Sequence, residues 1–589
     1  MRFRYALKIL SLSILGVLLV SAFMPSTSTT NPKPVMTSYN PSPANNFHAP
    51  LSSMAIVALT NATPNIQSLA SSSSQSSVAS NLKTIRQNAL RFIIDDTYFP
   101  QSETTIAVDP NNPSHVVGGF NDGKYFYCLF LPSDCGSSFS VSLSGFTTSV
   151  DGGATVAKSS DIPNINTTDP ILTSWGDPSV AASIDGNFYY ASLAISPGGS
   201  FFGGGIMIAK SNSNLFDPNI SCTTTISSPL VNPCWKDVFV NGTNIFPNFN
   251  FEDKDRIAVD RDQTSPYYGA VYVGWDHFYP PGLSQSYLSR CDSNLVHCTM
   301  VSGGDHPVVS GSDPFVGWTT PVVDKNGDVY LTWCNFGTFT TFGPVSCRIS
   351  SSPPGGAGFS PPVDILSYMG SGTTLPTDTV IIGWATEQFR TSPGIVSLVA
   401  DLSSKSSNLY FTTTVCTLGH YYRFSWLNAR VAMDNPGNCG QSAVLLSQSR
   451  DGGQSWSSPT TLSRPVVNDQ SFVTVDSQTG TLYDVYYTTQ YDPFNHRIDV
   501  VASTSNNLGK TFSQQRVTTV SNEPDSDPNI YDYIVRNGFG GSFTVPQYGD
   551  YFEATALSGT LWVLFTGNYA VEAGTFQTDP FLAVFRQAS

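Results

Sequence analysis

The chain has 589 residues, of which 28 are Lys or Arg and 43 are Asp or Glu, so its formal net charge is −15. Charged residues make up only 12% of the chain and aromatic residues another 12%, which excludes a coiled coil and a highly charged disordered chain. The acidic balance argues against nucleic acid as a partner, because no broad basic surface is available to bind phosphates. The length fits one large repetitive body or about four ordinary domains.

The N-terminal segment has the pattern of a targeting sequence. Three basic residues precede an apolar run over residues 9–23, and small polar residues follow. We expect residues 1–30 to form a signal peptide or N-terminal anchor, and residues 31–88 to form a flexible segment rich in Ser, Thr, Asn and Pro. The protein is therefore expected to be secreted or extracellular, with anchoring at the cell surface as the alternative. No other apolar run is long enough to span a membrane.

The ten cysteines fall into five pairs of near neighbours along the chain. Such usage suits an oxidising compartment, in which local disulfides form. We predict five disulfides, each closing a short loop and contributing about 2–3 kcal/mol if unstrained. Metal ligation is the weaker alternative, because the chain has neither a CxxC nor an HExxH motif. The predicted pairs are Cys128 with Cys135, Cys222 with Cys234, Cys291 with Cys298, Cys334 with Cys347, and Cys416 with Cys439.

An internal repeat dominates the sequence after about residue 90. Each copy has a β-rich run that ends in Asp, a turn containing Gly or Asn, and a second β-rich run that ends in aromatic residues. Seven such copies occur, the last of them over residues 552–565. Regular spacing of this kind predicts stacked equivalent units. The Asp positions of the first six copies, separated by 76, 75, 64, 77 and 75 residues, are Asp109, Asp185, Asp260, Asp324, Asp401 and Asp476.

A second motif follows the third strand that we expect in several copies. It consists of Ser, then Asp or Asn two positions later, then Gly, with an aromatic residue closing the best copies. Ser and Asp side chains satisfy backbone N–H groups in such a turn, and Gly permits positive φ. We therefore interpret these carboxylates as structural, because the turn uses the acceptor atoms that catalysis would need. The residues are Ser149, Asp151, Gly153, Ser449, Asp451, Gly453, Trp456, Ser505, Asn507, Gly509 and Phe512.

Four strands in each copy, with this turn joining the third strand to the fourth, predict an all-β fold. The expected architecture is a β-propeller of four-stranded antiparallel blades over residues 89–589. Seven copies favour seven blades, and six blades are the alternative. The last copy lacks an obvious fourth strand, which residues 89–94 would supply if both ends of the chain close the ring.

The turn motif is similar to the Asp box of sialidases and other Asp-box (BNR repeat) β-propellers. Residues 101–122 resemble the opening blade of secreted sialidase-like repeat proteins, and residues 255–260 resemble their third blade. This resemblance covers about residues 90–587 and implies a propeller related to glycan chemistry. A likeness of fold is an analogy, so catalysis has to be tested residue by residue.

Sialidase catalysis, as the resemblance implies it, uses three arginines, a Tyr nucleophile activated by Glu, and an Asp acid/base. The first arginine lies in an [F/Y]-R-I-P sequence, which is absent from this chain; residues 90–93 are the nearest stretch. The sequence therefore argues against this chemistry. The remaining stand-ins, which their spacing does not select over other residues of the same types, are Arg348, Glu387, Arg390, Arg423 and Tyr548.

No cofactor or metal is expected from the motifs. Residues 324–328 resemble the start of a calcium loop but lack the downstream Glu, so a hairpin turn is favoured, with a structural calcium ion as the alternative. The low charge and the abundance of Ser, Thr and Asn also suit an acidic external medium, in which carboxylates lose their charge.

The expected function is that of an exported propeller that binds a glycan or another cell-surface ligand through its loop-bearing face. One alternative is a glycoside hydrolase of the sialidase type or with diverged chemistry. The other is a structural envelope or adhesion protein, which the Ser- and Thr-rich N-terminal segment favours.

Overall fold

The computed structural model describes residues 84–86, 89–95, 100–125, 140–166, 171–195, 203–244, 250–279, 283–302, 316–335, 345–368, 380–381, 388–389, 396–403, 408–418, 441–493, 497–522, 534–536, 542–544, 548–572 and 575–587. The expected targeting segment and most of the expected flexible segment lie outside these residues. So do three of the ten cysteines, Cys128, Cys135 and Cys439.

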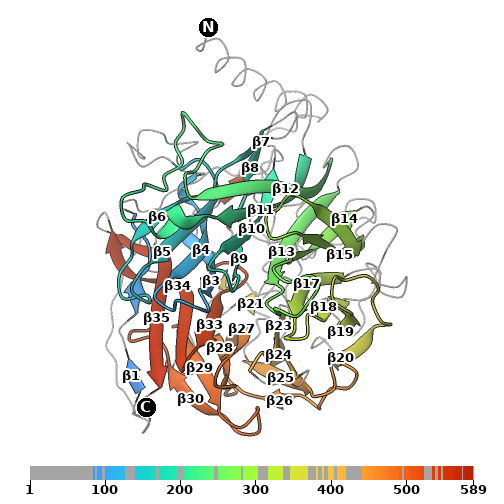
Figure 1. The fold of residues 1–589 in the computed structure, drawn as a ribbon. Coiled ribbons are helices and arrows are strands. Elements are labelled where there is room, and N and C mark those ends of the chain that lie inside the picture. Colours follow the sequence, from blue (N-terminus) through green and yellow to red (C-terminus); the bar gives the residue numbers. More distant parts are fainter. Residues whose placement is uncertain are drawn as a thin grey trace, which may run out of the picture.

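The described chain forms seven blades around a common axis, each built on four antiparallel strands (Figure 1). The first strands of neighbouring blades contact one another in an unbroken circle, in the order β3, β9, β13, β17, β23, β27, β33 and back to β3. These are the innermost strands, and later strands of each blade lie progressively farther out. The all-β propeller fold predicted from the sequence is confirmed, with seven blades rather than six.

The strands of the first four blades have the following bounds. Blade 1 contains β3 (Gln101–Val108), β4 (Val116–Asp122), β5 (Ser144–Ser149) and β6 (Lys158–Asp161). Blade 2 contains β9 (Ser179–Ala182), β10 (Phe188–Ile195), β11 (Gly203–Ser211) and β12 (Trp235–Asn244), with β7 (Ile165–Asn166) and β8 (Ile171–Ser174) added beside β10. Blade 3 contains β13 (Phe251–Val259), β14 (Val271–Tyr279), β15 (Leu283–Cys291) and β16 (Cys298–Ser302). Blade 4 contains β17 (Val316–Val323), β18 (Val329–Asn335), β19 (Val345–Ser352) and β20 (Val363–Tyr368).

The remaining elements complete the ring. Blade 5 contains β23 (Val396–Ala400), β24 (Leu409–Leu418), β25 (Gln441–Ser449) and β26 (Thr460–Thr461). Blade 6 contains β27 (Asn468–Val475), β28 (Leu482–Thr488), β29 (Asp499–Ser505) and β30 (Ser513–Arg516). Blade 7 contains β33 (Glu553–Leu557), β34 (Thr560–Glu572) and β35 (Thr575–Gln587). Two short hairpins, β21 (Val380–Ile381) with β22 (Gln388–Phe389) and β31 (Ile534–Arg536) with β32 (Ser542–Thr544), and the 3-10 helix η1 (Ser213–Phe216) lie between blade strands.

Both ends of the chain close the ring in blade 7. Strand β35 pairs with two N-terminal strands, β1 (Thr84–Arg86) and β2 (Leu90–Arg91). The prediction that residues 89–94 supply the missing outer strand is confirmed for β2, although the pairing starts earlier, at β1. Because this blade joins sequence positions almost 500 residues apart, as in the pair Arg91 and Asp579, ring closure depends on both termini.

The hydrophobic core lies between the blades. Blades 3 and 4 bury Tyr272, Leu288 and Trp333 in one cluster, and blades 5 and 6 bury residues such as Tyr410 and Tyr486 in another. Most of these aromatic residues belong to second strands, as the repeat pattern predicts. Burial of each large apolar side chain contributes about 1.5–3 kcal/mol, so the stacked faces hold neighbouring blades together.

Three of the five predicted disulfides are confirmed, and each closes a loop within one blade. Cys291 bonds Cys298 between β15 and β16, and Cys334 bonds Cys347 between β18 and β19. The other two predicted pairs include cysteines outside the described residues. Disulfides of this kind are typical of proteins in an oxidising compartment.

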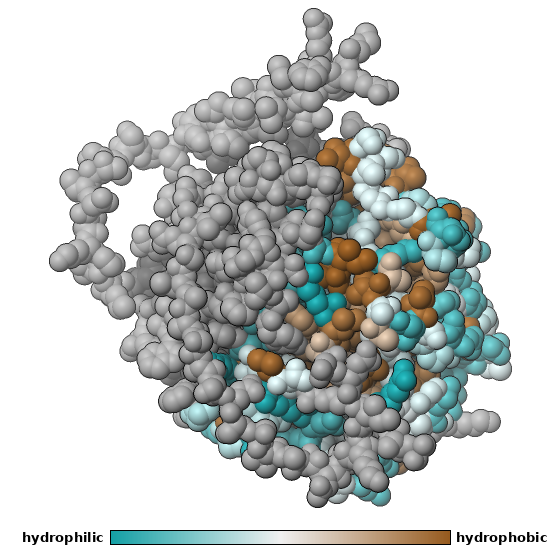
Figure 2. All heavy atoms as spheres, turned by 90° about the vertical axis from the view of Figure 1, so that its left-hand side faces the viewer, coloured by the Kyte–Doolittle hydropathy of each residue, from teal (hydrophilic) through white to brown (hydrophobic). Residues whose placement is uncertain are grey.

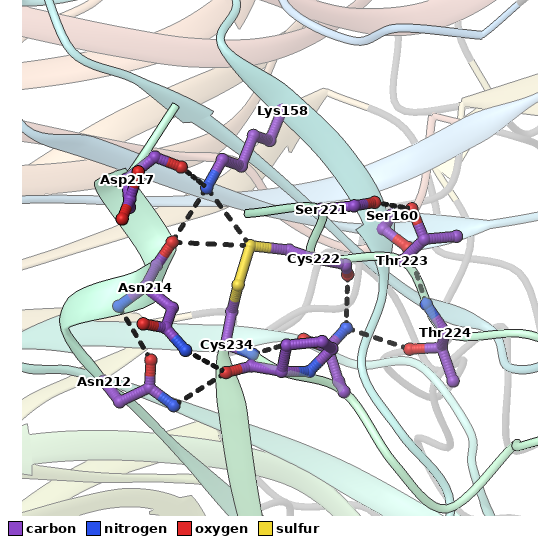
Figure 3. The surroundings of a disulfide bond; sticks show 12 residues. Lys158, Ser160, Asn212, Asn214, Asp217, Ser221, Cys222, Thr223, Thr224 and Cys234 are labelled. Atoms are coloured by element: carbon purple, nitrogen blue, oxygen red, sulfur yellow. Dashed lines mark hydrogen bonds between the residues drawn. A yellow bond between two sulfur atoms is a disulfide. The ribbon is translucent and has the colours of Figure 1, made fainter. Parts of the chain in front are cut away.

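The third disulfide, between Cys222 and Cys234, fastens the segment after η1 to the start of β12 (Figure 3). The Lys158 ammonium group lies beside it and donates to the carbonyl oxygens of Asn214 at 2.8 Å and Asp217 at 2.7 Å. These bonds tie the outermost strand of blade 1 to the η1 turn, and the disulfide therefore reinforces a contact between two blades.

The surface on the side drawn in Figure 2 mixes apolar and hydrophilic residues over the described atoms. Among the described residues, large apolar side chains that are well exposed are few, and they include Ile226, Val231 and Val296. Apolar side chains scattered in this way are normal for a protein surface. No helix within the described ranges is long and apolar enough to cross a membrane.

Candidate functional site

Four innermost strands contain a β-bulge close to their start, and the bulge is centred on a non-glycine residue with positive φ. These residues are Glu103 (φ 51°), Lys254 (φ 59°), Trp318 (φ 65°) and Gln470 (φ 48°). Positive φ costs a non-glycine residue about 1–3 kcal/mol and occurs preferentially at functional sites. Recurrence at the same place in four blades therefore marks one end of the axis as the candidate site.

Two further blades have a residue with positive φ just before the innermost strand. Asp177 (φ 54°) precedes β9 in blade 2, and Gly549 (φ 77°) followed by Asp550 precedes β33 in blade 7. The corresponding segment of blade 5 precedes β23 and lies outside the described residues. We call the following six residues the axial ring: Glu103, Asp177, Lys254, Trp318, Gln470 and Asp550.

Lys254 reaches across the axis. It belongs to blade 3, yet its Nζ atom lies 3.5 Å from Oδ2 of Asp550 in blade 7. The same Nζ atom is 3.9 Å from Oδ2 of Asp253 and 4.2 Å from the centre of the Trp318 ring. Carboxylates and the face of an indole ring both attract an ammonium group, so the axial ring already holds one cation.

A second ion pair crosses the axis next to the first. Arg256 of β13 lies 3.1 Å from Glu553 of β33, and its guanidinium carbon is 3.8 Å from the centre of the Tyr551 ring. Thr105 donates to the other oxygen of Glu553 at 2.5 Å. Arg256 and Glu553 also line a cavity of about 230 Å³ whose other walls are mostly apolar residues of all seven innermost strands. The charged groups therefore gather where these strands begin, at one end of that cavity.

Hydrogen bonds between blades hold the axial ring in place. Asn121 of β4 donates to Glu103 at 2.5 Å and accepts from the Asp177 N–H at 2.8 Å. The other oxygen of Glu103 accepts from the Asp550 N–H at 3.0 Å. The Glu103 carboxylate and the Asn121 amide thus join blades 1, 2 and 7. These bonds hold the positive-φ backbone in place without a ligand.

Gly549 is required at its position on two counts. Its φ of 77° belongs to the left-handed region, and a Cβ atom there would lie 2.1 Å from Cγ of Glu103. The Gly549 carbonyl also accepts from Gln470 of blade 6 at 2.5 Å. The close approach of blades 1, 6 and 7 at the axis therefore depends on a residue without a side chain.

Carboxyl groups outnumber cations in and beside the axial ring. Among the described residues, at least six carboxyl groups and two cationic side chains are buried there, and burying charges is costly unless they are paired. Two of the six, Asp177 and Asp255, are at most 1% exposed, and their carboxylate oxygens make no hydrogen bond among the described residues. The six carboxyl groups are Glu103, Asp177, Asp253, Asp255, Asp550 and Glu553, and the cations are Lys254 and Arg256.

The pKa values of these groups follow from their surroundings. Burial raises the pKa of Asp177 well above its usual range, and the carboxylates of Glu103 and Asp253 raise it further. Burial also raises the pKa of Asp255 well above its usual range, although Arg256 opposes the shift. Burial therefore disfavours the charged form of both carboxyl groups.

The catalytic stand-ins named from the sequence are not brought together among the described residues. Arg348 lies on β19, the third strand of blade 4, where its Nε atom donates to the Asp364 side chain at 2.7 Å. Tyr548 is fully buried, packs edge-on against Tyr487, and directly precedes Gly549. The other three candidates, Glu387, Arg390 and Arg423, lie outside the described residues.

The Ser and Asp residues of the turn motif bond their own turns. In blade 1, Ser149 Oγ accepts from the Gly153 N–H and Asp151 Oδ1 accepts from the Thr155 N–H, both at 2.9 Å. Blades 5 and 6 have the same two bonds, so the acceptor atoms are occupied within each turn. In these equivalent bonds a backbone N–H group donates to a side-chain oxygen: Gly453 to Ser449 at 2.8 Å, Ser455 to Asp451 at 2.9 Å, Gly509 to Ser505 at 2.9 Å and Thr511 to Asn507 at 3.0 Å.

The segment that resembles a calcium loop is a hairpin turn between β17 and β18. Oδ1 of Asp324 accepts from the backbone N–H groups of Asn326 at 2.8 Å and Asp328 at 3.1 Å. Over the described ranges, no three His, Cys, Asp or Glu side chains are placed to hold a metal ion.

The sequence reasoning missed the axial ring, although the chain carries a signal for it. In a chain with only 12% charged residues, polar and charged residues stand directly before the repeated strand pattern in several copies. Residues 101–103, 253–255, 468–470 and 549–551 are examples. The recurrence of such residues at one repeat position predicts that they meet at one end of the axis.

Comparison with known proteins gives distant structural similarity only. No protein-family model and no curated protein matches the chain. A protein of unknown function from Dyadobacter fermentans matches with a TM-score of 0.42 and 10% identity, over 86% of this chain and 99% of that chain. Trypanosoma rangeli sialidase in complex with sialic acid matches with a TM-score of 0.36 and 11% identity, over 85% of this chain and 74% of that chain.

A third match is the GH93 α-L-arabinofuranosidase of Fusarium graminearum, with a TM-score of 0.36 and 10% identity over 74% of this chain and 98% of that chain. Sialidases are thus among the solved structures to which this chain is similar, as its sequence motifs led us to expect. Similarity this distant concerns the fold, and we draw no conclusion about activity from it.

Proposed function

We propose that this protein is exported and binds a carbohydrate ligand at the axial ring. The observation that carries the proposal is the convergence of carboxyl, amide, ammonium and indole groups from six blades on one end of the axis. Each of these blades has a positive-φ residue there. In five of these blades the residue is not glycine, and backbone strain that recurs at one place and is held by hydrogen bonds between blades is typical of a preorganised binding site.

The chemistry of the axial ring suits a sugar. Sugar hydroxyl groups both donate and accept hydrogen bonds, and the ring offers the Asp550 carboxylate, the Gln470 amide and the Lys254 ammonium group. Lys254 Nζ lies over one face of the Trp318 ring, and we propose that the other face packs against the C–H groups of a pyranose. Hydrogen bonds at such a buried place are stronger than in water, so a few of them are sufficient for specificity.

The remaining features agree with an exported binder. Three disulfides suit an oxidising compartment, and the N-terminal 30 residues are proposed as the export signal or anchor. The partner is a glycan or a glycan-bearing cell surface, and the proposal needs no cofactor. The turn residues such as Asp151 and Asp451 are assigned a structural role.

Binding should be tested with the full mature chain on a glycan array, followed by isothermal titration with the best ligand. Replacing Asp550 with Asn removes one ring carboxylate, and we expect affinity to fall about tenfold or more. Asp364→Asn is the matched control, because it removes the same charge from the outer strand β20, where the side chain is 63% exposed. Equal affinity of wild type and Asp550→Asn, with both folded, would overturn the proposal.

A second candidate function, glycoside hydrolysis, is favoured by one observation. A buried carboxyl group with a raised pKa, as burial and the carboxylate of Glu103 give Asp177, is suited to protonate a glycosidic oxygen. A panel of fluorogenic glycosides at pH 4–7 tests this function. Turnover that disappears in Asp177→Asn would support hydrolysis, and absence of turnover with intact glycan binding would leave binding as the function.

A further inference from the structure

The cavity of about 230 Å³ that begins beside the axial ring follows the axis, and we call it the axial cavity. Arg256 and Glu553 line it near one end. The strand-end residues Val259 and Val323, together with Arg261, line the other end. One water molecule requires about 10–15 Å³ of such space, so the axial cavity has room for a small molecule.

The walls of the axial cavity are mostly apolar. Five consecutive blades each contribute an apolar side chain that is only partly buried, and all five side chains line the cavity. Covering such surface with an apolar group is favourable by about 25 cal/mol for each Å². The axial cavity therefore favours a ligand with an apolar part. The five residues are Ala181, Ile257, Val322, Val399 and Phe472.

Arg261 supplies a positive charge at the strand-end side of the axial cavity. Its Nε and Nη2 atoms donate to the Ala182 carbonyl oxygen of the neighbouring blade at 2.9 and 2.6 Å, which fixes the guanidinium group. Among the residues that the structure describes, its Nη1 atom has no hydrogen-bond partner and no carboxylate lies within ion-pairing distance. Burial lowers the pKa of Arg261, because removing a cation from water destabilises it. An anion beside Arg261 would offset this cost.

The acidic residue that acts electrostatically on Arg261 is Asp109. Its carboxylate accepts from the Asn111 N–H at 2.9 Å, and its Oδ2 atom lies 3.7 Å from Nδ1 of His115. Asp109 does not line the axial cavity. Among the described lining residues the acidic one is Glu553, which lies at the opposite end. The strand-end part of the cavity therefore presents a cation and apolar walls to a ligand.

We propose that the axial cavity binds an aliphatic carboxylate of medium chain length, with its carboxylate on Arg261 and its alkyl chain along the apolar walls. A guanidinium group recognises a carboxylate through charge-assisted hydrogen bonds, and the alkyl chain covers the partly exposed apolar side chains. This inference goes beyond the proposed function. The site lies at the opposite end of the axis from the axial ring and does not depend on carbohydrate binding.

The proposal is tested by isothermal titration of the full mature chain at pH 7 with octanoate, 1-octanol, octylammonium and acetate. We expect octanoate to bind about tenfold or more tightly than octanol, because only octanoate forms charge-assisted bonds with Arg261. Octylammonium and acetate should bind more weakly still, since one carries the wrong charge and the other lacks the chain. Equal affinity for octanoate and octanol would overturn the role of Arg261, and absence of saturable octanoate binding would overturn the site.

Substitutions connect this preference to the axial cavity. Arg261→Gln should lower octanoate affinity about tenfold and change octanol affinity much less. Arg450→Gln is the matched control, because exposed Arg450 also donates to a carbonyl oxygen of the neighbouring blade, that of Leu508 at 3.1 Å. Val399→Phe fills part of the cavity and should weaken both ligands, and it is the second variant if Arg261→Gln has no cooperative melting transition. Unchanged octanoate affinity in either folded variant would contradict the proposal.

Discussion

The two ends of the innermost strands use aspartate for different purposes. Where these strands end, the Asp carboxylates accept backbone N–H groups of their own turns and are satisfied locally. Where the strands begin, in the axial ring, the carboxyl groups face one another across the axis. At each of five strand ends, a backbone N–H group of the turn donates to the Asp carboxylate. The donor and acceptor residues are Asn111 and Asp109 at 2.9 Å, Asp262 and Asp260 at 3.0 Å, Asn326 and Asp324 at 2.8 Å, Ser403 and Asp401 at 3.0 Å, and Gln478 and Asp476 at 2.9 Å.

The difference shows that residue type alone does not assign a role. An Asp inside a tight turn is surrounded by N–H donors, which keep its acceptor atoms occupied. Asp177 in the axial ring is surrounded by other acids, because six blades direct their strand starts to one place. Substitutions in the turns where the innermost strands end should therefore mainly change stability. Substitutions in the axial ring, where these strands begin, should mainly change binding.

The largest loss of stability is expected from breaking a turn between two blades. Asp476 accepts from Gln478 and Thr479 of its own turn and from Ser558 and Gly559 of blade 7. Asp476→Ala should lower the free energy of unfolding by about 2–4 kcal/mol, because several N–H groups lose their acceptor. Chemical denaturation measures the loss. Unchanged stability, or loss of ligand affinity in the folded fraction, would contradict the separation of the two ends.

The pH dependence of stability sharpens the comparison, because buried carboxyl groups prefer their protons. Burial raises the pKa of both Asp161 and Asp276 to about 7, against about 3.9 in an unfolded chain. Between these values the folded state binds protons that the unfolded state lacks. Lowering the pH through 7 should therefore stabilise the fold, by about 1.4 kcal/mol per group for each pH unit in this window.

Differential scanning calorimetry at constant ionic strength should show a higher melting temperature at pH 5 than at pH 8. Asp276→Asn should flatten this dependence, because one of the titrating groups is removed. This outcome would also agree with the acidic medium that the low charge content suggests. A stability maximum near neutrality or above would show that the buried carboxyl groups do not dominate the pH dependence.

The smallest effect is expected in the turn motif at the rim. Asp151→Asn should change stability by less than about 0.5 kcal/mol, because Asn507 makes the equivalent bond to its turn at 3.0 Å in blade 6. The measurement is a urea melt of the variant beside wild type. A loss of 2 kcal/mol or more would mean that the charge of Asp151, and not its acceptor geometry, stabilises the turn.

The sequence predicts the features that depend on residues close together in the chain. Six regularly spaced strands that end in Asp, together with a seventh copy of the repeat, predicted the blades. The turn of Asp151 involves residues at most four positions apart. Short loops likewise predicted disulfides such as Cys291 with Cys298. The axial ring depends on residues such as Glu103 and Asp550, which are 447 positions apart. Closure of the ring and the positive-φ bulges bring such residues together. The sequence predicted the closure, but the bulges are not visible in local patterns.

The most direct test is a crystal structure of the protein in complex with the best carbohydrate ligand from the glycan array. We expect a sugar bound on the axis at the start of the innermost strands, within hydrogen-bonding distance of axial-ring side chains such as Asp550. A sugar bound only at the rim, beside the turns of Asp151 or Asp451, would contradict the assignment of the axial ring as the binding site.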